Sequence, residues 1–266
     1  RNCPYVRCIL ERAIEGGYNY LGALFGAEGC AAMERMEEHF FLLKPVENER
    51  FFVTIIDPPM KGDNTSLDYY KAQLREKVLD KLHQVYGIDT SEKALRGAIE
   101  KHNDLCRTVT AIGDFRRLDN PPITGYEFHV IQLVSQVCPH DLILPYLKET
   151  LEELKTRQPE PKFPFRTRVV LAGSEIDDPD HDELECLVKD YHADGIIYES
   201  MKFCEFWSYE KVLASHILSA ERGIPCCTIE KEYTLGSVGQ LRTRLQAFVE
   251  SLEIKKLEAA RKGETK

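Results

Sequence analysis

Residues 169–198 read VVLAGSEIDDPDHDELECLVKDYHADGIIY and place two apolar runs, 169–173 and 195–198, on either side of a helix-like segment. Short continuous runs of aliphatic residues are typical of strands that are buried on both faces of a parallel sheet. A third run, CCTI at 226–229, follows a helical pattern at 208–222, and another helical pattern at 239–255 closes the series. This alternation predicts a parallel sheet that is doubly wound by helices.

The rest of the chain repeats this alternation once and then departs from it. The first part predicts a helix beginning at Pro4, a strand at 20–25, a helix opening at Cys30 and a strand at 51–56. Four segments with helical spacing follow, at 66–86, 90–112, 123–137 and 141–155, and the proline-rich stretch 158–164 predicts a stiff linker. We therefore predict an α/β protein with two flavodoxin-like doubly wound parallel-sheet domains and an intervening helical region. The expected bounds are 1–62 for a truncated first α/β domain, 63–157 for the helical region and 165–257 for the second α/β domain.

The composition excludes several classes of protein. The chain has 266 residues, of which 43% are hydrophobic, so it can bury a substantial core. A net charge of −9 without a basic stripe argues against nucleic acid as a partner. No apolar run approaches the roughly 18 residues of a membrane-spanning helix, and no nucleotide-binding glycine motif occurs. Because the sequence begins with Arg1, we expect it to start inside a longer protein.

Nine cysteines are the most informative feature of the composition. In a reducing compartment, which we expect here, they would not pair as disulfides. Cys3, Cys30 and Cys204 share one context, because each follows a loop or a strand end and precedes a helix. Three thiolates from separate segments can hold a 4Fe–4S cluster with one iron left open, although each cysteine could equally be a small buried hydrophobe. For the other six, packing is the favoured interpretation, and Cys8 could also support the same site.

One series of motifs carries a resemblance to a known family. It comprises DGII at 194–197, KFC at 202–204, GIP at 223–225, EY at 232–233 and GQLRTRLQAFVE at 239–250. In this order and spacing the series resembles the 2-hydroxyacyl-CoA dehydratase family, which also contains the class I benzoyl-CoA reductase subunits and the double-cubane cluster proteins. Asn2-Cys3-Pro4 and Gly29-Cys30 look like the two earlier cluster cysteines of that family.

The resemblance implies a 4Fe–4S cluster bound by Cys3, Cys30 and Cys204. It also implies a homologous second subunit in a heterodimer and a separate ATP-hydrolysing iron–sulfur activator. The activator would supply a low-potential electron that makes a ketyl radical of the CoA-thioester substrate, which then expels its hydroxyl group. Such oxygen-sensitive chemistry implies an anaerobic cytoplasm. Glu205, beside Cys204, is a candidate catalytic group for handling protons, and Ser200 is a candidate polar contact.

The resemblance leaves several functions open. A benzoyl-CoA reductase subunit would pass electrons to an aromatic ring, a double-cubane protein would need more cysteine ligands, and a non-catalytic subunit would only relay electrons or act as a scaffold. The sequence also departs from the family. Only Arg1 and Asn2 precede the first cysteine, and a single helix spans the gap between the strands at 169–173 and 194–197. We therefore expect that a segment present in family members is missing near residues 184–187.

Overall fold

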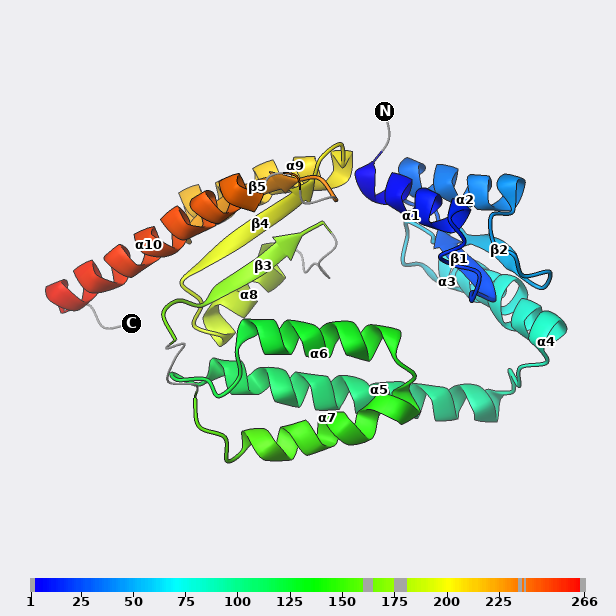
Figure 1. Cartoon of the computed structure of the whole chain (residues 1–266), viewed down its shortest axis with the longest axis horizontal. Helices are drawn as coiled ribbons and strands as arrows, with labels where there is room; N and C mark the ends of the chain where they lie inside the picture. Colours follow the sequence, from blue (N-terminus) through cyan, green and yellow to red (C-terminus); the bar gives the residue numbers. More distant parts are fainter. Residues whose placement is uncertain (1–2, 160–164, 175–180, 234–235, 237, 264–266) are drawn as a thin grey trace. The chain divides into compact units, whose positions relative to one another are not determined.

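A computed structural model describes residues 3–159, 165–174, 181–233, 236 and 238–263 (Figure 1). The predicted linker, at 160–164, and most of the acidic run before 181 lie outside these residues. By their contacts the residues group into two units. The first comprises 1–94, 201–205 and 230–236, and the second comprises 95–200, 206–229 and 237–266. The predicted domain bounds differ from this grouping and stay a prediction.

The first unit contains a small parallel sheet. Strand β1 (Ala23–Ala27) pairs with β2 (Phe52–Ile56) in a register that joins Ala23 to Phe52. Helix α1 (Pro4–Ile14) precedes β1, and α2 (Ala31–Leu43) connects the two strands. Both helices bury an apolar face in one cluster, whose fully buried members are Val6, Ala13, Met36, Phe40 and Val46. The expected helices are confirmed, and β1 begins three residues later than the predicted strand.

The same unit continues with the first of the predicted helical segments. Helix α3 (Asn64–Gln73), a π-helical turn (Leu74–Leu79) and α4 (Asp80–Tyr86) form one continuous helical run. The side chain of Asp63 accepts a hydrogen bond from the Ser66 N–H at 2.8 Å and so caps α3. Gly87, with φ of 67°, ends α4 in the left-handed conformation that glycine adopts readily.

The second unit begins with a helical layer. It consists of α5 (Glu92–Asp114), a short 3-10 helix (Phe115–Arg117), α6 (Gly125–Val137) and α7 (His140–Leu154). Thr124 and Glu127 form a capping box at the start of α6. The helices share a core whose buried members are Leu105, Ile112, Ile123, Phe128, Leu147 and Leu154. The four helical segments predicted from apolar spacing are thus confirmed.

The second unit also contains a three-stranded sheet in the order β3-β4-β5. The strands are β3 (Val169–Gly173), β4 (Gly195–Met201) and β5 (Cys226–Lys231). Strands β3 and β4 are parallel, and Val169 lies opposite Gly195. The N–H of Ile196 donates to the Pro225 carbonyl, and that of Lys202 donates to the Lys231 carbonyl. Residue numbers therefore rise together on β4 and β5, which is the pattern of a parallel pair.

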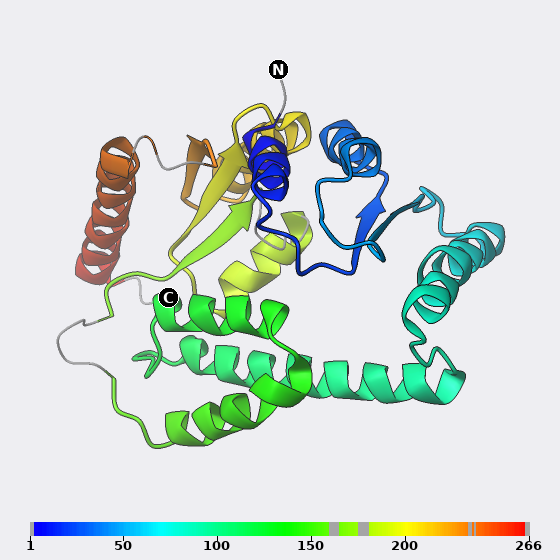
Figure 2. The ribbon, with the colours of Figure 1, turned by 45° about the vertical axis from the view of Figure 1, so that its right-hand side comes forward.

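Helices cover both faces of this sheet. Helix α8 (His181–Asp190), α9 (Glu205–His216) with the π-turn Ile217–Glu221, and α10 (Val238–Lys262) follow the three strands. Ile196 packs with α8 and α9 in one buried cluster, whereas its neighbour Gly195 faces Phe248 and Leu252 of α10. Successive residues of a strand face opposite sides of the sheet. Helix α10 therefore covers one face of the sheet, and α8 and α9 cover the other (Figure 2).

The predicted α/β class is therefore right, and both sheets are small. Within the described ranges they have two and three strands. The strand order β3-β4-β5 follows the chain and contains no reversal, whereas a flavodoxin-like sheet reverses its order at a switch point. The structure supports parallel sheets with helices and does not confirm two flavodoxin-like domains.

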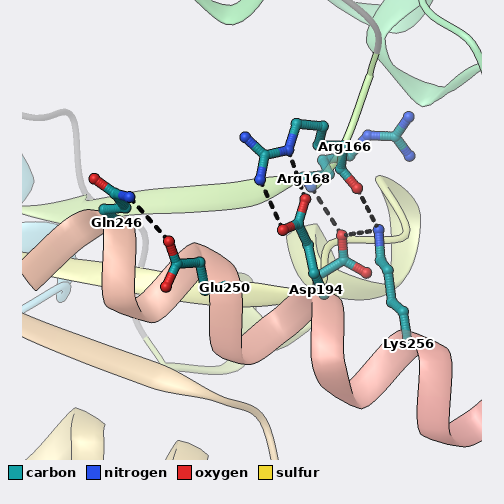
Figure 3. Close-up of polar contacts among 7 residues, drawn as sticks. Arg166, Arg168, Asp194, Gln246, Glu250 and Lys256 are labelled. Atoms are coloured by element: carbon teal, nitrogen blue, oxygen red, sulfur yellow. Dashed lines mark hydrogen bonds and ion pairs between the residues drawn. The ribbon is translucent and has the colours of Figure 1, made fainter.

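A buried arginine joins three parts of the second unit. The Arg168 guanidinium donates to the Tyr191 carbonyl at 2.5 Å and to the Leu118 carbonyl at 2.6 Å, and its backbone N–H donates to Asp194 at 2.8 Å. Asp194 also accepts an ion pair from Lys256 of α10 at 2.6 Å (Figure 3). This cluster lies where β3 and β4 begin, and it connects the sheet with α10 and with the end of the helical layer.

We expect Arg168→Met to lower the free energy of unfolding by about 2–4 kcal/mol, because the buried Arg168 side chain loses its hydrogen bonds to two part-buried carbonyl groups. Urea unfolding followed by circular dichroism measures this change. Arg166→Met is the matched control, since the Arg166 side chain is 61% exposed and binds Glu253 at the surface. The free energy of unfolding of Arg166→Met should fall by less than about 1 kcal/mol. Equal losses of unfolding free energy in the two variants would contradict the claim that Arg168 stabilises the second unit more than Arg166 does.

Candidate functional site

Cys3 is the N-cap residue of α1. Its carbonyl accepts the Arg7 N–H at 3.2 Å, and Pro4 occupies the first helical position. The Cys3 side chain makes no capping bond to the helix and packs at the edge of the core cluster of the first unit. The thiol therefore lies at the positive end of a helix dipole, which stabilises a thiolate or an anionic group.

Cys30 is placed in the same way at the start of α2. It is extended, with φ of −137° and ψ of 109°, and its carbonyl accepts the Glu34 N–H at 3.0 Å. Its side chain makes no capping bond and is exposed. The connection from β1 to Cys30 is only Glu28-Gly29, so this thiol lies beyond the carboxyl end of a parallel strand. In open α/β sheets that edge is where ligands bind.

Cys204 follows the carboxyl end of β4 and immediately precedes α9. Its N–H donates to the Met201 carbonyl at 3.1 Å, which closes a tight turn. Phe203 in this turn has φ of 66°, a left-handed conformation that is unfavourable for a bulky side chain. Such backbone strain costs of order 1–3 kcal/mol and is concentrated at functional sites. The strain falls on the residue directly before the cysteine.

The three cysteines thus share a local geometry and belong to the same unit. Cys204 lies in the segment 201–205, which groups with residues 1–94. None of the three is in a disulfide, and all are half-buried or exposed. Across the described ranges, however, no three His, Cys, Asp or Glu side chains gather closely enough to hold a metal ion. The ligand set Cys3, Cys30 and Cys204 therefore stays a prediction.

Contacts that the sequence did not indicate join the segments of Cys3 and Cys204. Tyr5 of α1 packs against Tyr233 with 5.3 Å between ring centroids. The Lys202 ammonium forms a 2.8 Å ion pair with Glu232. The hydrogen bond from Lys202 lowers the pKa of Glu232, and the charge of Arg7 on α1 lowers it further. The motif at 232–233 was visible in the sequence, but nothing there indicated that its partners would be Tyr5 and Lys202.

The two predicted catalytic residues differ in their surroundings. Ser200 is fully buried on β4, where its hydroxyl accepts from the Lys211 ammonium at 2.9 Å and lies 3.5 Å from the Ile229 carbonyl. Glu205 is exposed in the first turn of α9, next to Cys204. Neither residue is placed against a reacting group by any contact described, so both catalytic roles stay predictions.

Glu37 of α2 is a buried carboxyl group that the sequence analysis did not single out. It is 1% exposed, and within the described part of the chain its Oε2 atom has no hydrogen-bond partner. It packs against Gly26 of β1, where an added Cβ atom would lie 1.9 Å from Oε1. Burial raises the pKa of Glu37, and the nearby charges of Glu34 and Glu28 raise it further. A glutamate in an otherwise amphipathic helix gives no sequence signal of burial.

The raised pKa makes the stability of the first unit depend on pH. Because folded Glu37 holds its proton more tightly than the unfolded chain does, its favourable contribution is complete below the unfolded pKa of about 4.3 and is lost as pH rises through the higher folded value. Glu37→Gln should remove this loss. We expect the stability of the variant relative to wild type to increase between pH 4.5 and neutral pH, as measured by urea unfolding at several pH values. A difference that is independent of pH would contradict a buried neutral carboxyl.

The remaining cysteines divide into two groups. Cys226 of β5 packs against the buried cluster around Ile196, and burial raises the pKa of Cys226 to about 11 and also raises that of Cys227. Cys106 was interpreted as a core residue, and that was wrong. It is exposed on α5, and its sulfur lies 3.4 Å from Nε2 of His102 one turn earlier. The apolar spacing of α5 did not reveal that Cys106 lies on its polar side.

The described helices include none that is both long and apolar enough to cross a membrane.

The family of the chain follows from comparison with known sequences. The sequence model of the 2-hydroxyglutaryl-CoA dehydratase D-component family matches residues 1–186 and 178–252. The chain belongs to this family. The resemblance based on the carboxyl-terminal motifs and the helix-capping cysteines is thereby confirmed.

Two curated relatives are similar over most of their length. A protein named as a dehydratase subunit, YjiM of Escherichia coli K12, is 20% identical over 313 residues, covering 94% of this chain and 76% of the relative. The (R)-phenyllactyl-CoA dehydratase beta subunit of Clostridium sporogenes is 20% identical over 308 residues, covering 94% and 80%.

These comparisons bear on the segment expected to be missing. Both alignments are longer than the 266 residues of this chain, so the relatives contain residues that it lacks. The two matches to the family overlap at 178–186, which covers residues 184–186 of the predicted place. In the structure α8 runs without interruption from His181 to Asp190, and Glu185 pairs with Lys189 one turn later at 2.7 Å. Among the described residues between β3 and β4, α8 is the helix that connects the two strands.

Proposed function

We propose that the chain is the iron–sulfur subunit of a 2-hydroxyacyl-CoA dehydratase, with Cys3, Cys30 and Cys204 as ligands of a 4Fe–4S cluster. The observation that carries the proposal is that three cysteines of one unit, from separate segments and not in disulfides, each directly precede a helix. Thiolates are the ligands that such clusters require, and three of them leave one iron open for substrate. The donor set therefore fits the cluster.

In this proposal the bound cluster supplies a low-potential electron and an open iron that acts as a Lewis acid. The chain contributes position and charge. Cys3 and Cys30 are the N-cap residues of α1 and α2, where the positive end of each helix dipole would stabilise a thiolate. Glu205, exposed beside Cys204, is the proposed group for moving a proton to or from the substrate. Ser200 could contact substrate only by giving up its present hydrogen bonds. We therefore propose a smaller role for it, as a polar contact to the substrate.

The proposal includes three partners and a location. These are a homologous second subunit, a separate ATP-hydrolysing iron–sulfur activator, a CoA-thioester substrate and an anaerobic cytoplasm. Support for a second subunit comes from the name of one relative, a beta subunit of (R)-phenyllactyl-CoA dehydratase. The same name favours elimination of water over reduction of an aromatic ring.

The experiment is an anaerobic assay of the chain co-purified with its second subunit, supplemented with the activator, ATP and a low-potential reductant. The probes are 2-hydroxyglutaryl-CoA, phenyllactyl-CoA and benzoyl-CoA, and the products are weighed by mass spectrometry. We expect a hydroxyacyl-CoA to lose one water. Addition of hydrogen to benzoyl-CoA, with both hydroxyacyl-CoAs unchanged, would overturn the proposal in favour of a reductase. A cluster-loaded protein that leaves all three probes intact would favour an electron-relay subunit.

A further inference from the structure

Four side chains connect the turn before Cys204 to the first turn of α1. Lys202, two residues before Cys204, pairs with Glu232 at 2.8 Å, and its N–H donates to the Lys231 carbonyl at 2.8 Å. The residue after Glu232 is Tyr233, whose ring packs on Tyr5, two residues after Cys3. All of these residues belong to the first unit. The contacts form an uninterrupted path between two of the three candidate ligands.

These contacts are poorly suited to a purely stabilising role. The Lys202 and Glu232 side chains are 45% and 50% exposed, and exposed ion pairs contribute little to stability. The position of these two residues beside the Cys204 turn indicates a role better than the strength of their ion pair does. They flank a turn in which Phe203 is held in the left-handed conformation, and such a turn persists only where its surroundings fix it. Glu232 pairs with Lys202 next to this turn and interacts electrostatically with Arg7 of α1, and the adjacent Tyr233 packs on Tyr5 of the same helix.

We propose that Tyr5, Lys202, Glu232 and Tyr233 form a positioning brace that holds the Cys204 turn beside the start of α1, so that the thiols of Cys3 and Cys204 are near each other before any cluster binds. Naming these thiols as cluster ligands rests on the proposed function, whereas their placement by the brace does not. A site that is preorganised in this way avoids ordering two distant segments when the cluster is inserted.

The test measures the proximity of the two thiols in the metal-free chain. The protein is treated with a bismaleimide that has an ethylene spacer, and the bridged peptides are identified by mass spectrometry. In the wild type we expect a prominent Cys3–Cys204 bridge. In the double variant Tyr5→Leu/Glu232→Gln the yield of this bridge should fall about fivefold or more, while circular dichroism and urea unfolding remain close to wild type.

The matched control is the double variant Tyr20→Leu/Asp141→Asn. It removes an exposed tyrosine that packs on Tyr18 and breaks the exposed Lys101–Asp141 ion pair, which also measures 2.8 Å. This control should retain the wild-type yield of the bridge. An unchanged bridge in the brace variant, or the lack of that bridge in the wild type, would overturn the proposal. The conservative single variant Tyr5→Phe keeps the ring contact with Tyr233 and the intact Glu232. It should therefore give the wild-type yield of the bridge, unlike Tyr5→Leu/Glu232→Gln.

Iron analysis of the same proteins separates the brace from the proposed function. If the brace variant loses the bridge and wild-type protein prepared without air contains no iron, the brace stands and the cluster proposal fails. If iron loads fully while the bridge does not depend on the four residues, the brace fails and the cluster proposal stands.

Discussion

Replacing Cys204 by serine is expected to reduce the iron content of protein prepared without air from about four atoms per chain to about one or fewer. Serine keeps the size of the side chain and removes the soft thiolate that the cluster requires. Cys3→Ser and Cys30→Ser should have the same effect, because each of the three ligands binds a different iron. The measurement is iron analysis combined with the visible absorption that gives such clusters their brown colour.

The control for this series is Cys106→Ser. Cys106 is an exposed thiol on α5 of the second unit, so its loss should leave the iron content unchanged. Equal iron losses for Cys106→Ser and Cys204→Ser would indicate a general effect of thiol loss. Full iron content in all three ligand variants would contradict the assignment of Cys3, Cys30 and Cys204.

Gly173→Ala is expected to have the largest effect on stability, a loss of about 4 kcal/mol or more. Gly173 ends β3 opposite Glu199 of β4 and has φ of 120°. A Cβ atom at this position would lie 1.7 Å from the Glu199 carbonyl oxygen, which is backbone and cannot rotate away. The variant must therefore separate the two strands or distort the chain near the carboxyl ends of both strands. Urea unfolding, or the soluble yield if folding fails, measures the effect.

Gly97→Ala is the matched control for that substitution. Gly97 lies inside α5 in helical conformation, and a Cβ atom there would meet no atom within 4 Å. Alanine has a higher helix propensity than glycine, so the free energy of unfolding of this variant should increase by about 0.5–1 kcal/mol. A loss of unfolding free energy below about 1 kcal/mol for Gly173→Ala would contradict the close contact between Gly173 and Glu199.

Much of the secondary structure could be predicted because it depends on local patterns. Apolar residues at helical spacing predicted α5, α6 and α7, and the prolines and glycines between them predicted their ends. The placement of Cys3 and Cys30 before helices was also visible, because Pro4 and the loop Glu28-Gly29 mark helix starts. The start of α9 was less clear, and the structure begins it at Glu205 rather than at 208.

The parts that could not be predicted depend on contacts between distant segments. The burial of Glu37 arises because Gly26 leaves room for its carboxyl group, and a single sequence does not show that these two residues meet. The pairing of Lys202 with Glu232, and of Tyr5 with Tyr233, follows from the way β4 and β5 end. The two and three strands predicted from the sequence are the ones found among the described residues, whereas the flavodoxin-like form predicted for the two domains is not confirmed.

The most direct test of the central claim is the iron and acid-labile sulfide content of the wild-type chain, purified without air. A cluster held by Cys3, Cys30 and Cys204 predicts about four iron and about four sulfide per chain. Folded protein that contains essentially no iron or sulfide would contradict the claim that these thiols form an iron–sulfur site.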